Sequence, residues 1–301
     1  MTATLDAAVP LTGRRIPGSS VARAMAGNRK ALAGLLILVF FVVLAAVPDW
    51  IAPGDPAASR YGRSLGASAH HLFGTTGFGQ DVAAQVVHGT RPILLIAVLS
   101  GVFATLLSVL IGVSAAYLGG LWDDLLSLFT DVILVIPVLP LVVVIAGYFA
   151  HRSLTVMIAA LVVTGWSYGA RQLRAQALSL RGRDFLEAAR VRGERRSYII
   201  VVELLPNMTS LIIANFMNVA LYSVLTASGL EFIGLGDTSS VDWGTMLYWA
   251  QNQAALQTDQ YLWAAVPGLC IALLSTSFAL LNNAFDEISN PALRPVRRLR
   301  G

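Results

Sequence analysis

The sequence predicts an all-α integral membrane protein with six transmembrane helices and both termini in the cytoplasm. Of its 301 residues, 56% are hydrophobic and only 13% are charged, whereas about a quarter of the residues of an ordinary soluble domain are charged. Six stretches are apolar enough to cross a bilayer, and basic residues gather in alternate connections between these stretches. Hydropathy thus predicts the fold class, and charge predicts the orientation.

The predicted spans follow from length. A helix needs about 20 mostly apolar residues to cross a hydrocarbon layer of about 30 Å. The first span follows basic residues, as a signal peptide does, but its apolar run is longer than the usual ~7–15 residues and further spans follow, so we expect it to be uncleaved. The fourth span is short, and Pro137 and Pro140 are expected to bend the third. The six stretches are 31–51, 92–118, 125–150, 154–168, 208–230 and 261–281.

The distribution of basic residues predicts which connections face the cytoplasm. With the N-terminus inside, 17 of the 21 basic residues fall in cytoplasmic segments, as the positive-inside rule requires. The outer segments hold Arg60, Arg63, Arg91 and Arg152. An anionic lipid leaflet and cytoplasmic partners account for the net charge of +4, so no nucleic-acid partner is expected.

The chain reads as one membrane domain, 31–290, between a cytoplasmic N-terminal tail, 1–30, and a C-terminal tail, 291–301. The outer loops, 52–91 and 231–260, are too small for an independent enzyme domain. The only lysine, Lys30, precedes alanine, so a Walker A loop is absent from the sequence, and the single cysteine has no partner within the chain. We expect a non-catalytic chain that binds no cofactor itself.

The cytoplasmic loop 169–207 is too long to be only a connection. Its centre, 183–193, has acidic residues early, arginine late and then Gly193, which is the pattern of a short helix with a left-handed cap. A second helix is expected from Glu194 to Pro206. Such a helix-turn-helix fits either a docking surface for another protein or an amphipathic helix packed under its own bundle.

The sequence Glu187-Ala188-Ala189, followed by Gly193 and then by Leu205-Pro206, resembles the EAA motif of membrane subunits of binding-protein-dependent ABC importers. Segments around it, including 72–75, 229–236 and 243–247, resemble the dipeptide, oligopeptide and nickel permeases, and most closely their C-type subunit. The resemblance covers roughly residues 25–295. Gln80, Leu128, Glu203 and Asn283 depart from the pattern of that subfamily.

The resemblance implies a complex in the prokaryotic cell membrane. Its expected partners are a second, B-type permease, two ATPase subunits that bind ATP and Mg, an extracytoplasmic solute-binding protein and a peptide substrate. The short helix would contact an ATPase and transmit its closure to the spans. The residues expected to couple the chain to the ATPase are Arg183, Asp184, Phe185, Glu187, Ala188, Ala189, Arg192, Gly193, Leu205 and Pro206.

Polar residues within spans are candidate pathway residues, because they are costly unless they face protein or water. Asp131 would be a counter-charge for a peptide amine or a helix-packing group. Asn215, Asn218 and Tyr222 recur at i, i+3 and i+7 and are expected to share one buried helical face. That face would line a hydrated pathway or bond to a neighbouring helix.

The outer segments carry two further groups. His70, His71 and His88 invite a metal hypothesis, but they lack further ligands at workable spacing, so structural or solvated histidines are expected. The second group is either a set of interfacial anchors or a docking surface for the binding protein, and consists of Asp237, Asp242 and Trp243.

Three other functions remain to be weighed against a peptide importer. A nickel-chelate importer has a similar permease, so the substrate stays open. A secondary carrier would not need the long cytoplasmic loop. An intramembrane enzyme would need a histidine or metal set within the spans, which the sequence lacks.

Overall fold

The structure, a computed structural model, describes residues 28–148 and 153–289. Within these two ranges the chain is helical, and its one strand-like feature is an isolated bridge between Thr75 and Asp81. The helices, in chain order, are α2 (Arg29–Ala46), α3 (Pro48–Ile51), α4 (Val82–Leu118), α5 (Gly120–Val135), α6 (Val138–Tyr148), α7 (Leu154–Arg181), α8 (Asp184–Val191), α9 (Arg196–Tyr198), the π-helical segment η1 (Ile199–Leu204), α10 (Leu205–Phe232), α11 (Trp243–Asn252) and α12 (Tyr261–Ser289).

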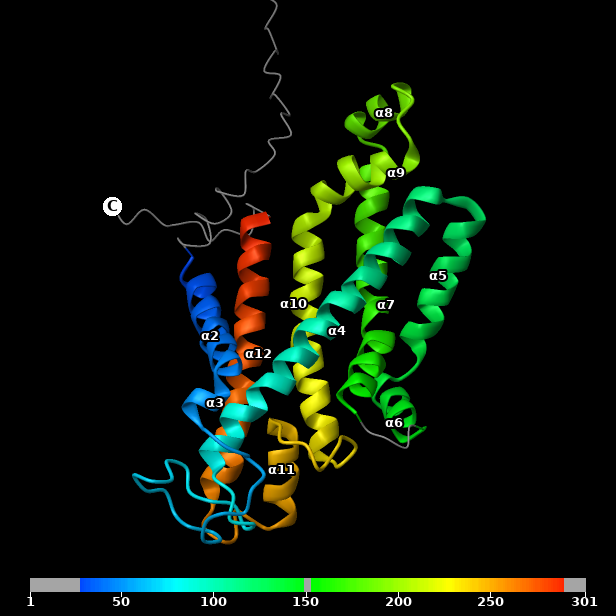
Figure 1. The fold of residues 1–301 in the computed structure, drawn as a ribbon. Coiled ribbons are helices and arrows are strands. Elements are labelled where there is room, and N and C mark those ends of the chain that lie inside the picture. The colour runs from blue at the N-terminus through cyan, green and yellow to red at the C-terminus, as the bar shows by residue number, and fades with distance from the viewer. Residues whose placement is uncertain (1–27, 149–152, 290–301) are drawn as a thin grey trace, which may run out of the picture.

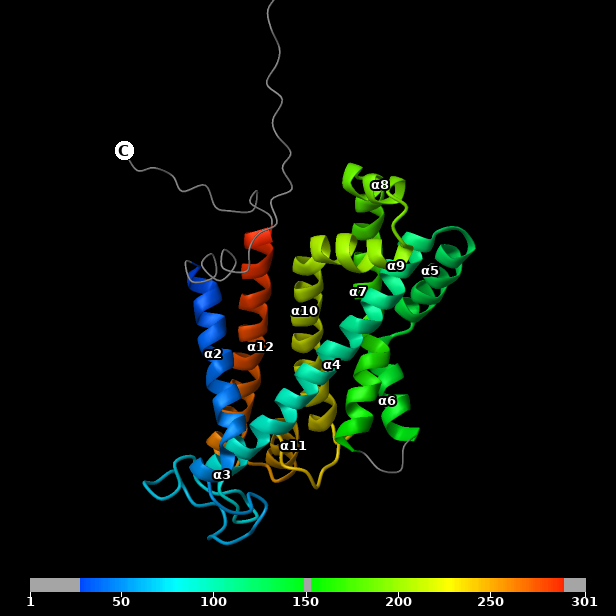
Figure 2. The ribbon, with the colours of Figure 1, turned by 45° about the horizontal axis from the view of Figure 1, so that its top comes forward.

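The long helix α4 runs obliquely across the bundle and joins its two sides (Figure 1). It packs against α7 and α5 on one side and against α10 and α2 on the other, while α12 fills the space between α2 and α10. Helix α8 lies at one end of the bundle, and α11 lies at the opposite end beside the loop before α4 (Figures 1 and 2). The start of α2 and the end of α12 lie at the α8 end.

Five helices are long and apolar enough to cross a membrane, and the pair α5–α6 makes a sixth span if it is counted as one. The all-helical membrane fold predicted from the sequence is therefore confirmed, and the orientation of the termini stays a prediction. The pair is bent by 87° between Val135 and Val138. Ile136, which precedes Pro137, has extended backbone angles, because the proline ring disfavours a helical residue before it. The expected bend is thus a full break rather than a kink.

Several helices extend beyond the apolar stretches that predicted them. Helix α4 begins at Val82 instead of residue 92 and contains Pro92, and α7 continues to Arg181 instead of ending at residue 168. Helical structure also runs without interruption from Arg196 into α10, so the helix predicted to end at Pro206 continues into the span predicted to begin at residue 208. Hydropathy measures the apolar part of a helix, whereas backbone hydrogen bonding continues into its polar ends.

The connections are correspondingly shorter than the predicted loops. The cytoplasmic loop predicted at 169–207 reduces to the residues between Arg181 and Arg196, with α8 in the middle. The outer loop predicted at 52–91 ends at Asp81, whose side chain accepts a hydrogen bond from the Ala84 amide and caps α4. The outer segment 231–260 contains α11. The predicted tails 1–30 and 291–301 lie almost entirely outside the described residues.

Each end of the bundle has its own cluster of buried apolar side chains. The larger cluster lies towards the α11 end and contains Phe41, Ile93, Trp243 and Trp263. A second cluster lies beneath α8 and joins α4, α7 and η1. Between them α4 and α7 approach closely at Gly112, where a Cβ atom would collide with the Ala170 carbonyl oxygen. Glycine is needed there because no side chain fits between the two backbones.

Candidate functional site

Helix α8 projects from the end of the bundle (Figure 2). Glu187 and Ala188 are exposed on this helix, whereas Leu186 and Ala189 are fully buried. Its first turn carries Asp184 and Glu187, and its last turn carries Arg190, so the charges match the helix dipole. The exposed face holds small and charged side chains that another protein surface can approach.

The turn after α8 depends on Gly193. Its φ is +77°, in the left-handed region where other residues are strained, and open space surrounds the position of a Cβ atom. The Gly193 amide donates to the Arg190 carbonyl at 2.9 Å, and the Glu194 amide donates to the Ala189 carbonyl at 3.2 Å. These bonds close the helix end as a Schellman-type cap does. The reversed turn predicted at this glycine is therefore present.

The opposite face of α8 is fixed to the bundle. Leu186 and Ala189 belong to the apolar cluster that includes Tyr117 of α4 and Leu173 of α7. Phe185 packs against the same cluster and is half-buried. The packing interpretation therefore holds for one face of the helix, while the other face is exposed and its role as a docking surface stays a prediction.

Four polar contacts of Arg190 and Arg192 add to this attachment. The Arg190 guanidinium lies 5.9 Å from the centre of the Tyr117 ring and donates a 3.0 Å hydrogen bond to the Arg181 carbonyl. Arg192 approaches Glu203 at 3.8 Å and Glu194 at 3.9 Å. The Arg192 side chain is half exposed, so these ion pairs are screened by solvent. Apolar burial, more than charge, fixes α8.

The remaining predicted coupling residues lie around this unit. Arg183 is the exposed residue that precedes α8, and Pro206 is exposed at the start of α10, while Leu205 is half-buried beneath the α8 cluster. The structure therefore brings together the two halves of the predicted motif at one end of the bundle.

Asp131 pairs with an arginine of a neighbouring helix. It is half exposed on α5, and its Oδ1 atom is 3.7 Å from an Arg171 nitrogen of α7. One turn away, Arg174 donates two hydrogen bonds of 2.6 and 2.8 Å to the Asp123 carboxylate. The Asp131–Arg171 and Asp123–Arg174 ion pairs therefore both join α5 to α7. This arrangement corresponds to the packing alternative for Asp131.

The three polar residues of α10 do not share one buried face as expected. Asn215 is buried, and its amide donates to the Thr105 hydroxyl of α4 at 3.1 Å, whereas Asn218 is exposed and accepts a 3.2 Å bond from Asn282 of α12. Tyr222 faces Gly165 of α7. A step of three residues falls about 60° short of a full helical turn, and this rotates Asn218 away from the other two.

Two of the three predicted docking residues at the outer end are buried. The Asp242 side chain caps α11 by accepting a 2.8 Å bond from the Thr245 amide, and Trp243 is fully buried with its indole donating to the Val86 carbonyl at 3.0 Å. The Trp243 ring packs edge-on against Phe41. The expectation of a docking surface fails for both residues, because the acidic residue caps a helix and the aromatic one fills the core. Asp237 remains exposed.

The outer histidines have structural contacts. His71 Nδ1 lies 2.7 Å from the Asp81 carboxylate, and His88 Nε2 lies 2.9 Å from the Ala52 carbonyl oxygen. His70 is exposed. In the described part of the chain, no three histidine, cysteine or acidic side chains come together as a metal site would require.

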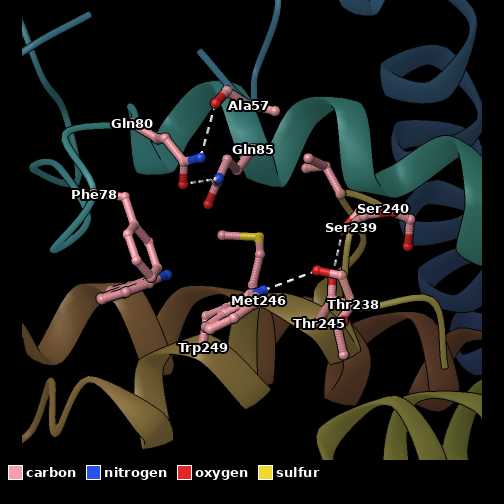
Figure 3. A pocket seen from close by; sticks show the side chains of 12 residues that line it. Ala57, Phe78, Gln80, Gln85, Thr238, Ser239, Ser240, Thr245, Met246 and Trp249 are labelled. Atoms are coloured by element: carbon pink, nitrogen blue, oxygen red, sulfur yellow. Dashed lines mark hydrogen bonds between the residues drawn. The ribbon is translucent and has the colours of Figure 1, made fainter. Parts of the chain in front are cut away.

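A cavity of about 260 Å³ opens between α4, α11 and the outer loops. Met246 and Trp249 enter it from α11, and Gln85 faces them from α4 (Figure 3). Gln85 donates to the Gln80 side chain at 2.8 Å, and Gln80 donates to the Ala57 carbonyl at 2.8 Å. The amides therefore join the outer loop to α4, and the cavity itself presents mainly aromatic and apolar surface.

Sequence reasoning missed Glu231 in the last turn of α10. Its side chain is 5% exposed and lines a second outer cavity with Asp237 and Asp242. The signal available in the sequence was an acidic residue directly after an apolar span.

Comparisons with known proteins agree with this architecture. Residues 108–294 match the family model described as the inner membrane component of binding-protein-dependent transport systems, and residues 17–67 match the N-terminal transmembrane domain of oligopeptide transport permease C. The dipeptide transport system permease protein of Bacillus subtilis (strain 168) is 30% identical over 275 residues, which cover 90% of this chain and 85% of that protein. The protein of the same name in Alkalihalophilus pseudofirmus is 28% identical and covers 89% of this chain and 87% of its own length.

Proposed function

This chain belongs to the family of inner membrane components of binding-protein-dependent transport systems, and from that premise we propose that α8 couples it to ATPase subunits during peptide import. The family makes the chain a multi-pass cell membrane permease subunit of an ABC importer, a class of subunit that is generally non-catalytic and works in a complex with other subunits. The proposal adds the coupling element, the partners and the substrate.

The observation that supports coupling is the two-faced packing of α8. Its buried face is continuous with α4, α7 and the start of α10, and its other face presents Glu187 and Ala188 to the surroundings. A contact on the exposed face would therefore move helices that run through the whole bundle. Coupling needs such an element, whose position depends both on the partner and on the spans.

The proposed complex contains a second, B-type permease, two ATPases and an extracytoplasmic binding protein. ATP and Mg would bind to the ATPases, and this chain would bind neither. We propose that the α8 end is cytoplasmic, in agreement with the eight arginines between residues 171 and 196. The α11 end would then face the binding protein.

We propose peptides as the substrate, because the relatives described above are named for dipeptide transport. A dipeptide and a longer oligopeptide remain equal candidates. A nickel chelate is the alternative, and the hydrogen bonds of His71 and His88 to other groups of the chain weigh against a metal site at those histidines.

The test is peptide uptake by the complete transporter in proteoliposomes that contain ATP. Gly193→Val should abolish uptake while the protein still inserts and assembles, since valine is strained at a positive φ. Gly182→Val is the matched control, because Gly182 flanks the other end of α8 with an ordinary φ of −92° and open space around it. Glu187→Arg should abolish uptake as well, because it reverses a charge on the proposed contact face.

Normal uptake by both Gly193→Val and Glu187→Arg would refute coupling through α8. If Gly182→Val lost as much peptide uptake as Gly193→Val, the added bulk in the loop, and not the altered turn at Gly193, would explain the loss. An untouched Mg-dependent ATPase rate with lost uptake would place the defect in transmission between the ATPases and the spans.

A further inference from the structure

Glu231 is a buried acidic side chain whose hydrogen bonding is incomplete. It lies in the last turn of α10 with 5% of its surface exposed. Its Oε2 atom has no hydrogen-bond partner among the described residues. A buried carboxyl group that lacks partners is costly, so its retention calls for a proton or a ligand.

Two glycines make room for this carboxyl group. A Cβ atom on Gly236 would lie 2.6 Å from the Glu231 Cγ atom, and a Cβ atom on Gly244 would collide with Oε2. Gly236 belongs to the loop after α10, and Gly244 belongs to the first turn of α11. The space around Glu231 is therefore built by backbone from two elements and is not an accidental gap.

A second buried carboxyl group, that of Asp242, lines the same cavity as Glu231. Asp242 accepts hydrogen bonds from the Thr245 amide at 2.8 Å and from the Ser240 hydroxyl at 2.7 Å. It is 3% exposed, so this carboxyl group is confined in the protein as that of Glu231 is. Two buried carboxylates so placed are not both stable without a cation or a proton between them.

The pair borders a cavity of about 220 Å³ that is suited to a cation with an apolar neighbour. Three of its lining residues carry carboxyl groups, namely Glu231, Asp237 and Asp242, and none of the lining residues in the described part of the chain is basic. The remaining walls combine the Ser153 and Ser240 hydroxyls with apolar side chains, among which are Leu154, Met157 and Leu235.

We propose that this cavity binds the primary ammonium group of the transported peptide, with Glu231 and Asp242 as its carboxylate partners. An ammonium group offers three N–H donors and one positive charge, which suits two carboxylates and a hydroxyl. A metal ion fits less well, since the described residues hold no set of three ligating side chains arranged as a metal would need. The inference rests on the proposed peptide substrate.

Ligand-observed saturation-transfer NMR on the complete permease complex in phosphatidylcholine nanodiscs tests the site directly. The probe is n-butylammonium at neutral pH, and n-butanol is the uncharged control. Glu231→Gln should weaken binding of the probe about tenfold or more, because it removes one charge-assisted hydrogen bond. Asp49→Asn, which removes an exposed carboxylate at the same end of the bundle on α3, should leave binding unchanged.

Two further measurements keep the test decisive. Asp237→Asn changes an exposed lining residue and should weaken binding of the probe less than Glu231→Gln does. Because this variant leaves the buried residues unchanged, it still tests the site if Glu231→Gln does not fold. Dialanine should displace the probe, whereas N-acetyl-dialanine should not, because acetylation removes the ammonium group.

Equal signals from wild type, Glu231→Gln and Asp237→Asn would overturn the site, as would equal signals from butanol and butylammonium. An absent signal in the wild type would indicate that a shared proton alone satisfies the carboxyl pair. Probe binding without displacement by dialanine would refute the peptide assignment. Peptide uptake in proteoliposomes is measured separately, so a failure of the proposed function is distinguishable from a failure of this site.

Discussion

The α8 end and the α11 end of the bundle contain similar charged side chains in different surroundings. Around α8, Glu187 and Arg192 are exposed, and the helix is fixed by the apolar residues Leu186 and Ala189 beneath it. Around α11, Glu231 and Asp242 are buried beside Trp243. One end thus offers charge to a partner surface, while the other encloses it in the protein. The position of a charge relative to the core, and not the number of charges, decides its effect on stability and binding.

The largest effect should come from the buried aromatic residue of the α11 end. Trp243→Ala is expected to reduce the free energy of unfolding by about 4 kcal/mol, since it removes a fully buried ring and leaves a cavity. Trp50→Ala, at a tryptophan that is 89% exposed, is the control and should change stability little. Thermal unfolding in one detergent compares the two. Equal losses would contradict the separation of core from surface.

The apolar anchor of α8 should rank next. Leu186→Ala is expected to cost about 3 kcal/mol locally, because Leu186 is fully buried between α8 and the spans. Hydrogen exchange should rise in α8 and η1 before it rises elsewhere. Val191→Ala on the same helix is the control, since Val191 is 88% exposed. Exchange that rises evenly over the whole chain would show that α8 is not a separate unit.

The cap of α11 should have a moderate effect. Asp242→Ala removes the oxygen that accepts from the Thr245 amide, and loss of such a cap costs about 1 kcal/mol. Asp242→Asn keeps a side-chain oxygen and should cost less. Thermal unfolding of the three proteins measures the difference. If the asparagine variant is as unstable as the alanine variant, charge and not capping keeps Asp242 in place.

The smallest effect is expected at the exposed ion pairs of the α8 end. Arg192→Ala removes contacts of 3.8 and 3.9 Å from a half-exposed side chain, and such pairs contribute about 0–1 kcal/mol. Unfolding measured at low and at high salt should show a small difference that salt removes. A loss that persists in high salt would place these pairs with the buried contacts of the α11 end.

Sequence reasoning predicted the spans better than the connections between them. The stretch 261–281 lies within α12, which begins at the predicted Tyr261, because apolar length and helical order coincide there. The predicted loop 169–207 was too long, because residues 169–181 include arginine, glutamine and serine among their apolar residues and yet are still helical. Gly193 was predicted with its turn, since a left-handed cap is a local property of the chain. Elements that depend on neighbouring residues could thus be predicted from the sequence.

The surroundings of individual side chains were harder to predict from the sequence than secondary structure was. Asn215, Asn218 and Tyr222 share a period in the sequence, but α4, α7 and α12 approach α10 from different directions and give each residue its own surroundings. Trp243 looked like an interfacial or docking residue, although its ring contacts Phe41, about two hundred positions earlier in the chain. Contacts across such separations leave no local pattern.

The sequence by itself determined that this chain is a helical membrane protein with a short capped helix between two spans, because hydropathy, charge and glycine act on neighbouring residues. Only the tertiary structure decided which face of α8 is free, that α5 and α6 part at 87°, and that Glu231 lies beside Asp242 in a cavity. The physical reason is that burial is a property of the assembled bundle. A carboxyl group is solvated or confined according to which distant helices pack around it.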